Sequence, residues 1–161
     1  LRQPLHAVSL VDERRLPGET HDDQGGNLSA VRVEIGAYPI RLHSLWDQLL
    51  GTDTHAETVL RIVAELQADA SLRPTEAELA SDDAVAIRRW AGESYRAAKQ
   101  SAYLNGQLPT AVWDDSQAQL PAVDDVPILP EGYERDARRV ARCRIVLAGE
   151  RLARTLKDVL Q

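Results

Sequence analysis

The sequence predicts an all-α fold, an irregular helical bundle that carries one short β-hairpin. Three observations predict it. Apolar residues recur at helical spacing over most of the chain, strand-like alternation is confined to one short segment, and turn-rich stretches separate the periodic segments. A chain of 161 residues is long enough for one domain with a core, so we expect a single domain over residues 1–161.

The first forty residues are predicted to contain an element boundary, a loop and a hairpin. Pro4 is expected to end a helix, and His6 follows two residues later, which places His6 near that boundary. The run from 17 to 27 is dense in turn residues and predicts a loop. Alternating apolar residues then predict a strand over 31–35 that returns through 38–40 as a hairpin.

Helices are predicted for most of the remainder. The segment 42–50 is predicted to end at Gly51, and a second helix is predicted to be capped by Asp53 or Thr54. A third starts at Asp82 or Asp83, and the last spans 134–160, after a connection from 107 to 132 that is rich in Pro, Asp and Gln. The apolar faces predicted for these four helices are, in order, Leu42, Leu45, Trp46, Leu49 and Leu50; Val59, Ile62, Val63 and Leu66; Ile87, Trp90, Ala91, Ser94 and Ala98; and Ala141, Ile145, Ala148, Leu152, Leu156 and Val159.

The composition is that of a soluble globular protein with an acidic balance. Hydrophobic residues make up 43% and charged residues 27% of the chain, and the formal net charge is −6. Proteins that hold nucleic acid on a general basic surface neutralise phosphates with Lys and Arg, so this charge argues against that class. Phosphate chemistry would need its positive charge from another source, and metal ions are the obvious one.

Cysteine content and the ends of the chain set further limits. Cys143 is the one cysteine, so a metal would be held by histidine and carboxylate groups and not by a cysteine-rich site. No segment approaches the ~20 apolar residues of a membrane span, and there is no signal-like start. Because the chain begins at Leu1 and contains no methionine, we expect a processed or truncated product.

One pair of residues in the stretch "RLHSLWDQLL" could carry metal chemistry. His43 and Asp47 lie beside the apolar stripe, four residues apart, so their side chains can converge on one point. Zinc accepts His nitrogen and carboxylate oxygen, and a catalytic site takes three protein ligands and leaves a place for water. His6, at the end of another element, is the candidate third ligand, so the predicted set is His6, His43 and Asp47.

The same residues allow a simpler interpretation, because a His–Asp pair one turn apart is more often a surface hydrogen-bonded pair than a metal site. The loop "DDQGGN" between the candidate ligands favours a site. Paired glycines let the backbone approach a neighbour closely, and Asn27 presents both a donor and an acceptor. By itself, however, such a loop is an ordinary turn more often than not.

The remaining candidates are weaker. His21 and His55 are expected to be solvated, and Cys143 to be a passive thiol without a partner base. The arginines of the last helix are expected to form its solvated face, and contact with a phosphate backbone is the alternative. They are Arg135, Arg138, Arg139, Arg142, Arg144, Arg151 and Arg154.

Three short motifs occur in the order of a known family. "QPLHA" (3–7), "DQGGN" (23–27) and "LHSLWD" (42–47) resemble the zinc-dependent single-strand nucleases and 3′-nucleotidases of the S1/P1 family, which is distantly similar to zinc phospholipase C. "WAGES" (90–94) and "RIVLAGERLARTL" (144–156) also look like helices of this family. Each motif alone is weak, but three in order with matching spacing are specific.

The resemblance implies an all-α fold around three zinc ions that hydrolyses phosphodiester bonds in single-stranded DNA and RNA and removes 3′-phosphates. By the same resemblance, His6, His43 and Asp47 match the ligands of one zinc, and Asn27 matches a residue that lines the nucleotide site. It also implies a single-stranded nucleic acid or nucleotide substrate, no membrane partner, and a secreted or periplasmic location.

The departures from the family pattern limit what this chain is expected to do alone. The ligands of the other two zincs are missing, as is the activating carboxylate, and Arg2 stands where many relatives have a histidine that is not a ligand. We therefore expect the C-terminal part of a longer nuclease domain, with one zinc, no assigned catalytic acid or base, and possible inactivity in isolation. Self-association through a surface exposed by truncation is a further expectation.

Two other functions remain open at this stage. One is a non-catalytic helical domain with a single structural zinc or a degenerate site. The other is a phospholipase C-like phosphodiesterase, although relatives of that type usually place Glu at the helical ligand position. Asp47 and the GGN loop before it favour the nuclease.

Overall fold

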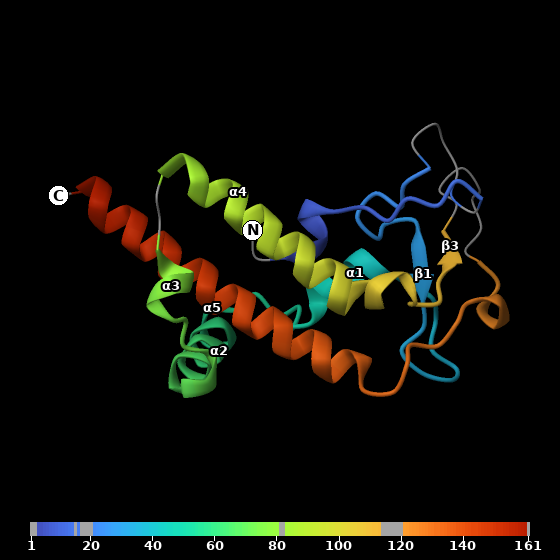
Figure 1. Ribbon diagram of the computed structural model, residues 1–161. Coiled ribbons are helices and arrows are strands. Elements are labelled where there is room, and N and C mark those ends of the chain that lie inside the picture. Colours follow the sequence, from blue (N-terminus) through green and yellow to red (C-terminus); the bar gives the residue numbers. More distant parts are fainter. Residues whose placement is uncertain (1–2, 15, 17–20, 81–82, 114–120, 161) are drawn as a thin grey trace.

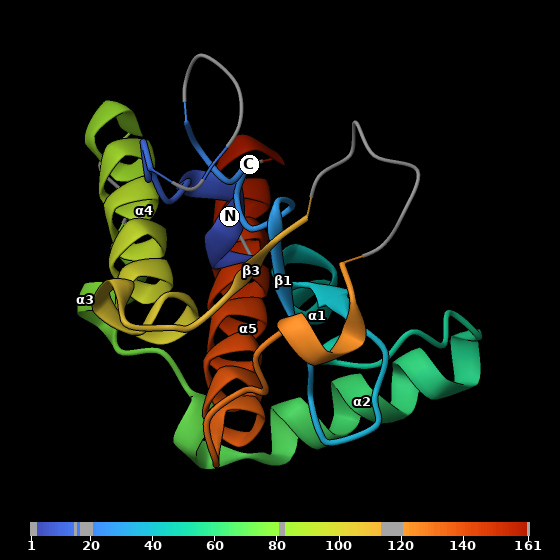
Figure 2. The same cartoon turned by 90° about the vertical axis from the view of Figure 1, so that its right-hand side faces the viewer.

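Helix α5 (Tyr133–Leu160) runs along the molecule, and the other elements are arranged around it (Figure 1). The computed structural model describes residues 3–14, 16, 21–80, 83–113 and 121–160. Helix α4 (Asp83–Ala97) lies on one side of α5, and α1 (Leu42–Gln48) and α2 (Ala56–Ala68) lie on the other (Figure 2). The shorter segments are α3 (Glu76–Leu79), the 3-10 turns η1 (Pro4–Ala7), η2 (Ala70–Leu72), η4 (Leu104–Gly106) and η5 (Val123–Asp125), and the π-helical η3 (Ala98–Ala102), which continues α4.

A small antiparallel sheet lies beside the start of α1. Its order is β2 (Ile40–Arg41), β1 (Ser29–Val31) and β3 (Ala111–Val112), with Ala30 paired to Arg41 on one side and to Ala111 on the other. The predicted hairpin is present, but β1 ends at Val31, and Ile35 is 87% exposed in the turn. Strand β3 was not predicted, because two residues in an aperiodic connection carry no strand signal of their own.

The mostly helical fold predicted from the sequence is confirmed, and the start of one helix differs from the prediction. Helix α4 starts at Asp83 as predicted, while Asp82 lies outside the described residues. Helix α2 begins after His55, not at Asp53 or Thr54. The Asp53 carboxylate instead accepts hydrogen bonds from His55 N at 2.8 Å and Thr58 Oγ1 at 2.7 Å, which closes the turn before the helix. Among the described residues, no helix has the length and apolarity that crossing a bilayer requires.

The core gathers where α1, η3 and the start of α5 meet. Leu42, Leu45, Trp46 and Leu49 are buried, as the sequence predicts for α1. Trp46 Nε1 donates to Tyr133 Oη at 3.0 Å, and Tyr133 Oη donates to the Ala102 carbonyl at 2.7 Å. Burial raises the pKa of Tyr133, so its hydroxyl stays protonated and keeps this link between three helical segments.

The buried faces of the later helices differ from the prediction. In α5 the buried residues are Tyr133, Ala137, Ala141, Arg144, Leu147 and Arg151. Leu152, Leu156 and Val159, predicted to be buried, are 60%, 49% and 75% exposed. On α4, Ile87 is 67% exposed while Ala86 is buried, and on α2 Val59 and Val63 are 44% and 40% exposed. Apolar spacing marks a face that can be buried, but the neighbouring elements decide whether it is.

Candidate metal centre

Two elements of different kinds carry the three candidate ligands. His6 lies on the single turn η1, which is anchored by the buried Leu5. Pro4 begins this turn, so the expectation that it ends a helix is wrong, because proline suits a first helical position. His43 and Asp47 lie one turn apart on α1, whose apolar stripe is fixed in the core. His6 and Asp47 are exposed and His43 is half-buried, so the three side chains meet at the surface.

The three side chains converge on one point. Their potential ligand atoms all lie within 4.8 Å of one another, and no other such group of His, Cys or carboxylate residues occurs in the part of the chain that is described. His43 Nε2 lies 3.6 Å from Asp47 Oδ2. Donors on a tetrahedral zinc with bonds of about 2.0 Å are roughly 3.3 Å apart, so this separation fits a shared ion. The His6 and His43 rings stack with centroids 5.2 Å apart.

The GGN loop sets the orientation of His43. His43 Nδ1 lies 2.8 Å from the Gly25 carbonyl oxygen, and because a carbonyl only accepts, Nδ1 carries the proton. The lone pair is then on Nε2, the nitrogen that faces Asp47. An imidazole that donates its second N–H to a backbone carbonyl is the usual arrangement of a metal-bound histidine.

Glycine is required in this loop because its backbone touches both ligand-bearing elements. Gly25 has φ +67°, and a Cβ there would lie 2.7 Å from the Leu5 carbonyl oxygen. Gly26 has φ +86° and its carbonyl accepts from His43 N at 3.2 Å. The close approach that the sequence predicts for the paired glycines is therefore an approach to η1 and α1.

Gln3 supports the centre and was not predicted to do so. Its Nε2 donates to Asp47 Oδ1 at 2.9 Å and to the His43 carbonyl at 3.2 Å, and the residue is 5% exposed. This bond holds one carboxylate oxygen of Asp47 and leaves Oδ2 directed at His43. A single glutamine far from Asp47 in the sequence gives no signal of this contact.

Asp23 anchors the loop from inside the protein. It is fully buried, and its carboxylate accepts from Leu10 N and Ser29 Oγ at 2.9 Å and from Tyr103 Oη at 3.0 Å. Burial, and then the Asp23 charge, raise the pKa of Tyr103, so the phenol remains a donor. The sequence placed Asp23 in a polar loop and gave no indication that it would be buried.

Asn27 directly follows the glycines that contact His43. It is half-buried, and its Nδ2 donates to the Gln24 carbonyl at 2.9 Å, which closes the turn. Its position next to the loop that contacts His43 is therefore defined by the same turn.

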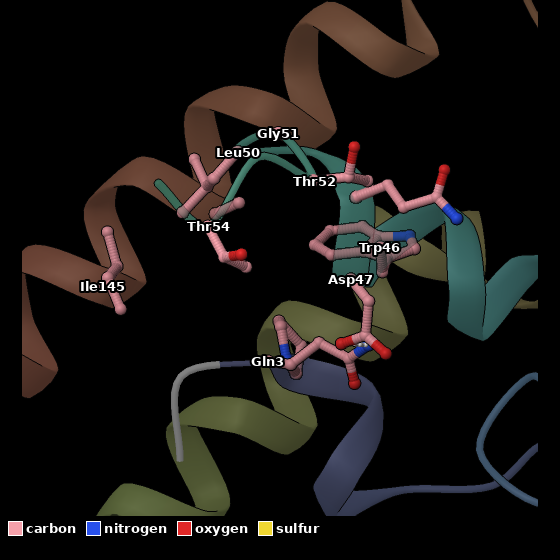
Figure 3. A pocket seen from close by; sticks show the side chains of 11 residues that line it. Gln3, Trp46, Asp47, Leu50, Gly51, Thr52, Thr54 and Ile145 are labelled. Atoms are coloured by element: carbon pink, nitrogen blue, oxygen red, sulfur yellow. Dashed lines mark hydrogen bonds between the residues drawn. The ribbon is translucent and has the colours of Figure 1, made fainter. Parts of the chain in front are cut away.

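A cavity of about 400 Å³ opens beside the centre (Figure 3). Asp47 forms part of its wall, so a group bound in the cavity would lie next to the candidate ligands. The lining is Gln3, Pro4, Trp46, Asp47, Gln48, Leu50, Gly51, Thr52, Thr54, Ala141 and Ile145. Among the described residues that line it, Asp47 is the only charged one, and the rest of the lining suits an uncharged ligand moiety.

The other candidate residues lie away from the centre. The side chain of His55 is 88% exposed and pairs with Asp53, as expected for a solvated histidine. His21 is half-buried, with Nδ1 2.9 Å from the Leu16 carbonyl, so the prediction that it is solvated is wrong. Cys143 is exposed.

The solvated arginine face predicted for α5 is wrong at two positions. Arg144 and Arg151 are 9% and 6% exposed, because acceptors from α3 and α4 pair with their guanidinium groups.

Comparison with known proteins gives one match. The chain matches the sequence model described as S1/P1 nuclease over residues 1–161. No curated protein and no solved structure is significantly similar to it.

Proposed function

Because the chain belongs to the S1/P1 nuclease family, whose members are generally zinc-dependent hydrolases, we propose that His6, His43 and Asp47 bind one zinc ion. The observation that carries this proposal is the convergence of the three side chains, with His43 Nδ1 held by the Gly25 carbonyl. A zinc ion there would polarise a phosphate, stabilise the charge that develops on it, and lower the pKa of bound water toward about 7.

The reaction that we propose is phosphodiester hydrolysis in single-stranded DNA and RNA and removal of 3′-phosphates. The protein's net charge of −6 makes a metal the natural source of attraction for phosphate. Apart from Asp47, the described residues that line the cavity are uncharged, which suits the nucleoside part of the substrate. We keep Asn27 as a substrate-binding residue, because its amide can hydrogen-bond a base edge next to the centre.

We further propose that this chain is the C-terminal part of the nuclease domain and supplies one zinc site of three. Turnover then requires ligands that this chain does not contain, and a secreted or periplasmic location follows from the family resemblance. The apolar cavity of about 530 Å³ between α2 and α5, with Val63 and Leu152 in its wall, supports self-association in isolation.

A purely structural zinc is the second candidate function. Structural sites close around the ion with four protein ligands, whereas catalytic sites keep a position open. Here His6 and Asp47 are exposed, which favours the open, catalytic type. The phospholipase C alternative is disfavoured because the helical ligand is Asp47 and not glutamate.

The zinc content of the purified chain after dialysis tests the proposal, with His43→Ala measured beside it. We expect one zinc per chain, lost in the variant, and His55→Ala is the matched control that keeps the metal. Absence of zinc from the parent chain would contradict the proposal. Two outcomes would favour a structural zinc: zinc raises the melting temperature, and the chain does not hydrolyse single-stranded DNA even when the missing part of the nuclease domain is supplied. Cleavage of phosphatidylcholine would favour the phospholipase C alternative.

A further inference from the structure

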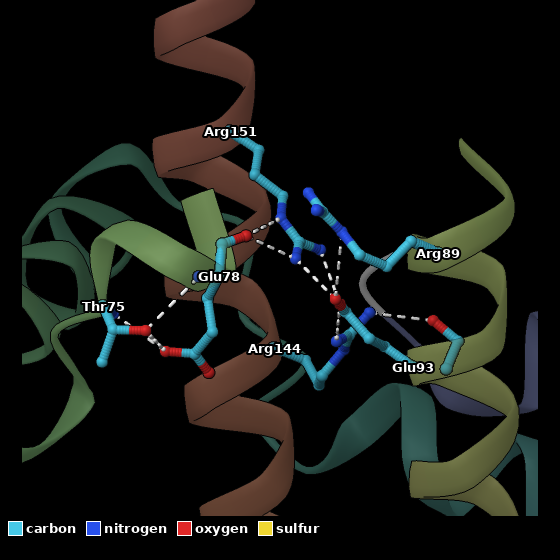
Figure 4. A network of polar contacts seen from close by, with 7 residues as sticks. Thr75, Glu78, Arg89, Glu93, Arg144 and Arg151 are labelled. Carbon is cyan, nitrogen blue, oxygen red and sulfur yellow. Dashed lines mark hydrogen bonds and ion pairs between the residues drawn. The ribbon is translucent and has the colours of Figure 1, made fainter. Parts of the chain in front are cut away.

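Two sequence motifs take no direct part in the candidate centre, "WAGES" on α4 and "RIVLAGERLARTL" on α5. The structure joins them in one ion cluster (Figure 4). Glu93 accepts from Arg151 Nη2 at 2.9 Å and from Arg144 Nη1 at 3.2 Å, and Arg144 Nη2 donates to Ser94 Oγ at 2.9 Å. Both arginine side chains are buried, so water cannot solvate their positive charges. The Glu93 carboxylate compensates these charges instead.

The cluster spans a space between two helices. Over their described residues, the backbones of α4 and α5 are not closely packed, and the long arginine side chains bridge them (Figure 4). The buried positions of α4 include Ala86 and Ser94, and the buried Ala98 follows at the start of η3. These small side chains remove little apolar area from water. Arg151 also donates to the Glu78 carbonyl of α3 at 2.7 Å. The place of α4 beside α5 therefore depends on polar contacts.

Helix α4 in turn supports the turn that carries His6. The turn η1 has only four residues, with His6 N donating to the Gln3 carbonyl at 3.3 Å, and it has no side-chain cap at its N-terminus. A single turn of this kind has little stability of its own. It packs chiefly against α4 and, less extensively, against η3. The position of His6 relative to His43 is therefore set by where α4 lies.

We propose that Glu93, acting through Arg144 and Arg151, is a positioning residue for the metal centre. It fixes α4, α4 fixes η1, and η1 places His6 opposite His43. This inference rests on the proposed zinc site, and Glu93 itself touches neither metal nor substrate.

The test is the zinc affinity of the chain, measured by competition with a chromophoric chelator. Glu93→Gln keeps the size of the side chain and removes its charge, and we expect zinc to bind about tenfold more weakly, as for other groups that orient ligands. The matched control is Asp69→Asn. Asp69 caps η2, and its 3.3 Å ion pair with Arg142 connects η2, not α4, to α5. Removing this ion pair should therefore leave the zinc affinity unchanged. Equal affinity in parent and Glu93→Gln would overturn the inference.

A double-mutant cycle separates positioning from general destabilisation. In a His6→Ala background, Glu93→Gln should weaken zinc binding no further, because the ligand that it positions is gone. Additive losses would overturn the inference. If Glu93→Gln does not fold, Ser94→Ala removes one hydrogen bond to Arg144 and enters the same cycle, with a smaller loss expected. Failure of the parent chain to bind zinc would reject the proposed function, whereas a folded Glu93→Gln chain with parental affinity rejects the positioning role alone.

Discussion

Helices α1 and α5 have similar apolar spacing in the sequence but bury different residues. In the stripe predicted for α1, Leu42, Leu45, Trp46 and Leu49 are buried and Leu50 is half-buried. In α5 the second half of the predicted stripe is exposed, while Arg144 and Arg151 occupy buried positions. Apolar spacing therefore predicts a buried face where apolar neighbours meet it. Where the neighbour is a carboxylate such as Glu93, charged side chains are buried instead.

Truncating one leucine in α1 and one in α5 should give the largest difference in the free energy of unfolding. Leu42→Ala removes a fully buried side chain and should lower the free energy of unfolding by about 2–5 kcal/mol. Leu156→Ala, at a side chain that is 49% exposed, should change it by no more than about 0.5 kcal/mol. Urea denaturation followed by circular dichroism measures both, and equal losses would contradict the assigned faces.

Substituting Gly25 and Gly36 compares a loop packed against η1 and α1 with a turn that has no close neighbour. Gly25 and Gly36 both have positive φ, so an alanine at either should cost about 1–2 kcal/mol of stability. Only at Gly25 does the added Cβ meet a neighbour, the Leu5 carbonyl oxygen at 2.7 Å. Gly25→Ala should therefore be the more destabilising and should also lose zinc. Zinc retained by Gly25→Ala as fully as by Gly36→Ala would show that the close approach does not hold the centre.

The smallest effect expected is the pH dependence of the cluster between α4 and α5. Burial alone would raise the pKa of Glu93, but hydrogen bonds from Arg151 and Arg144 outweigh burial and hold the pKa below its ordinary value. Its contribution to stability is thus fully present above the ordinary glutamate pKa of about 4.3 and is lost as the pH falls through the lowered value. The stability gap between parent and Glu93→Gln should narrow from pH 6 to pH 3, and a constant gap would contradict this.

The candidate ligands could be found from the sequence because their signal is local. His43 and Asp47 are one helical turn apart, and the turn residue Pro4 places His6 at an element boundary. The motifs that contain them also occur in the same order as in the family that the sequence resembles. The supporting residues carry no local signal, since Gln3 reaches Asp47 across 44 positions and Tyr103 reaches Asp23 across 80.

Short elements and buried charged residues could not be predicted from the sequence. Helix α3 has four residues and strand β3 has two, too few for a period to show. The buried arginines of α5 could not be separated from the exposed ones, because only the positions of Glu93, Ser94 and the Glu78 carbonyl distinguish them.

X-ray absorption at the zinc edge of the zinc-loaded chain tests the central claim most directly. Two imidazole nitrogens at about 2.0–2.1 Å and at least one oxygen are predicted, with one imidazole lost in His43→Ala. A spectrum unchanged by His43→Ala, or one without imidazole, would show that the ion lies elsewhere and would contradict the assignment of His6, His43 and Asp47.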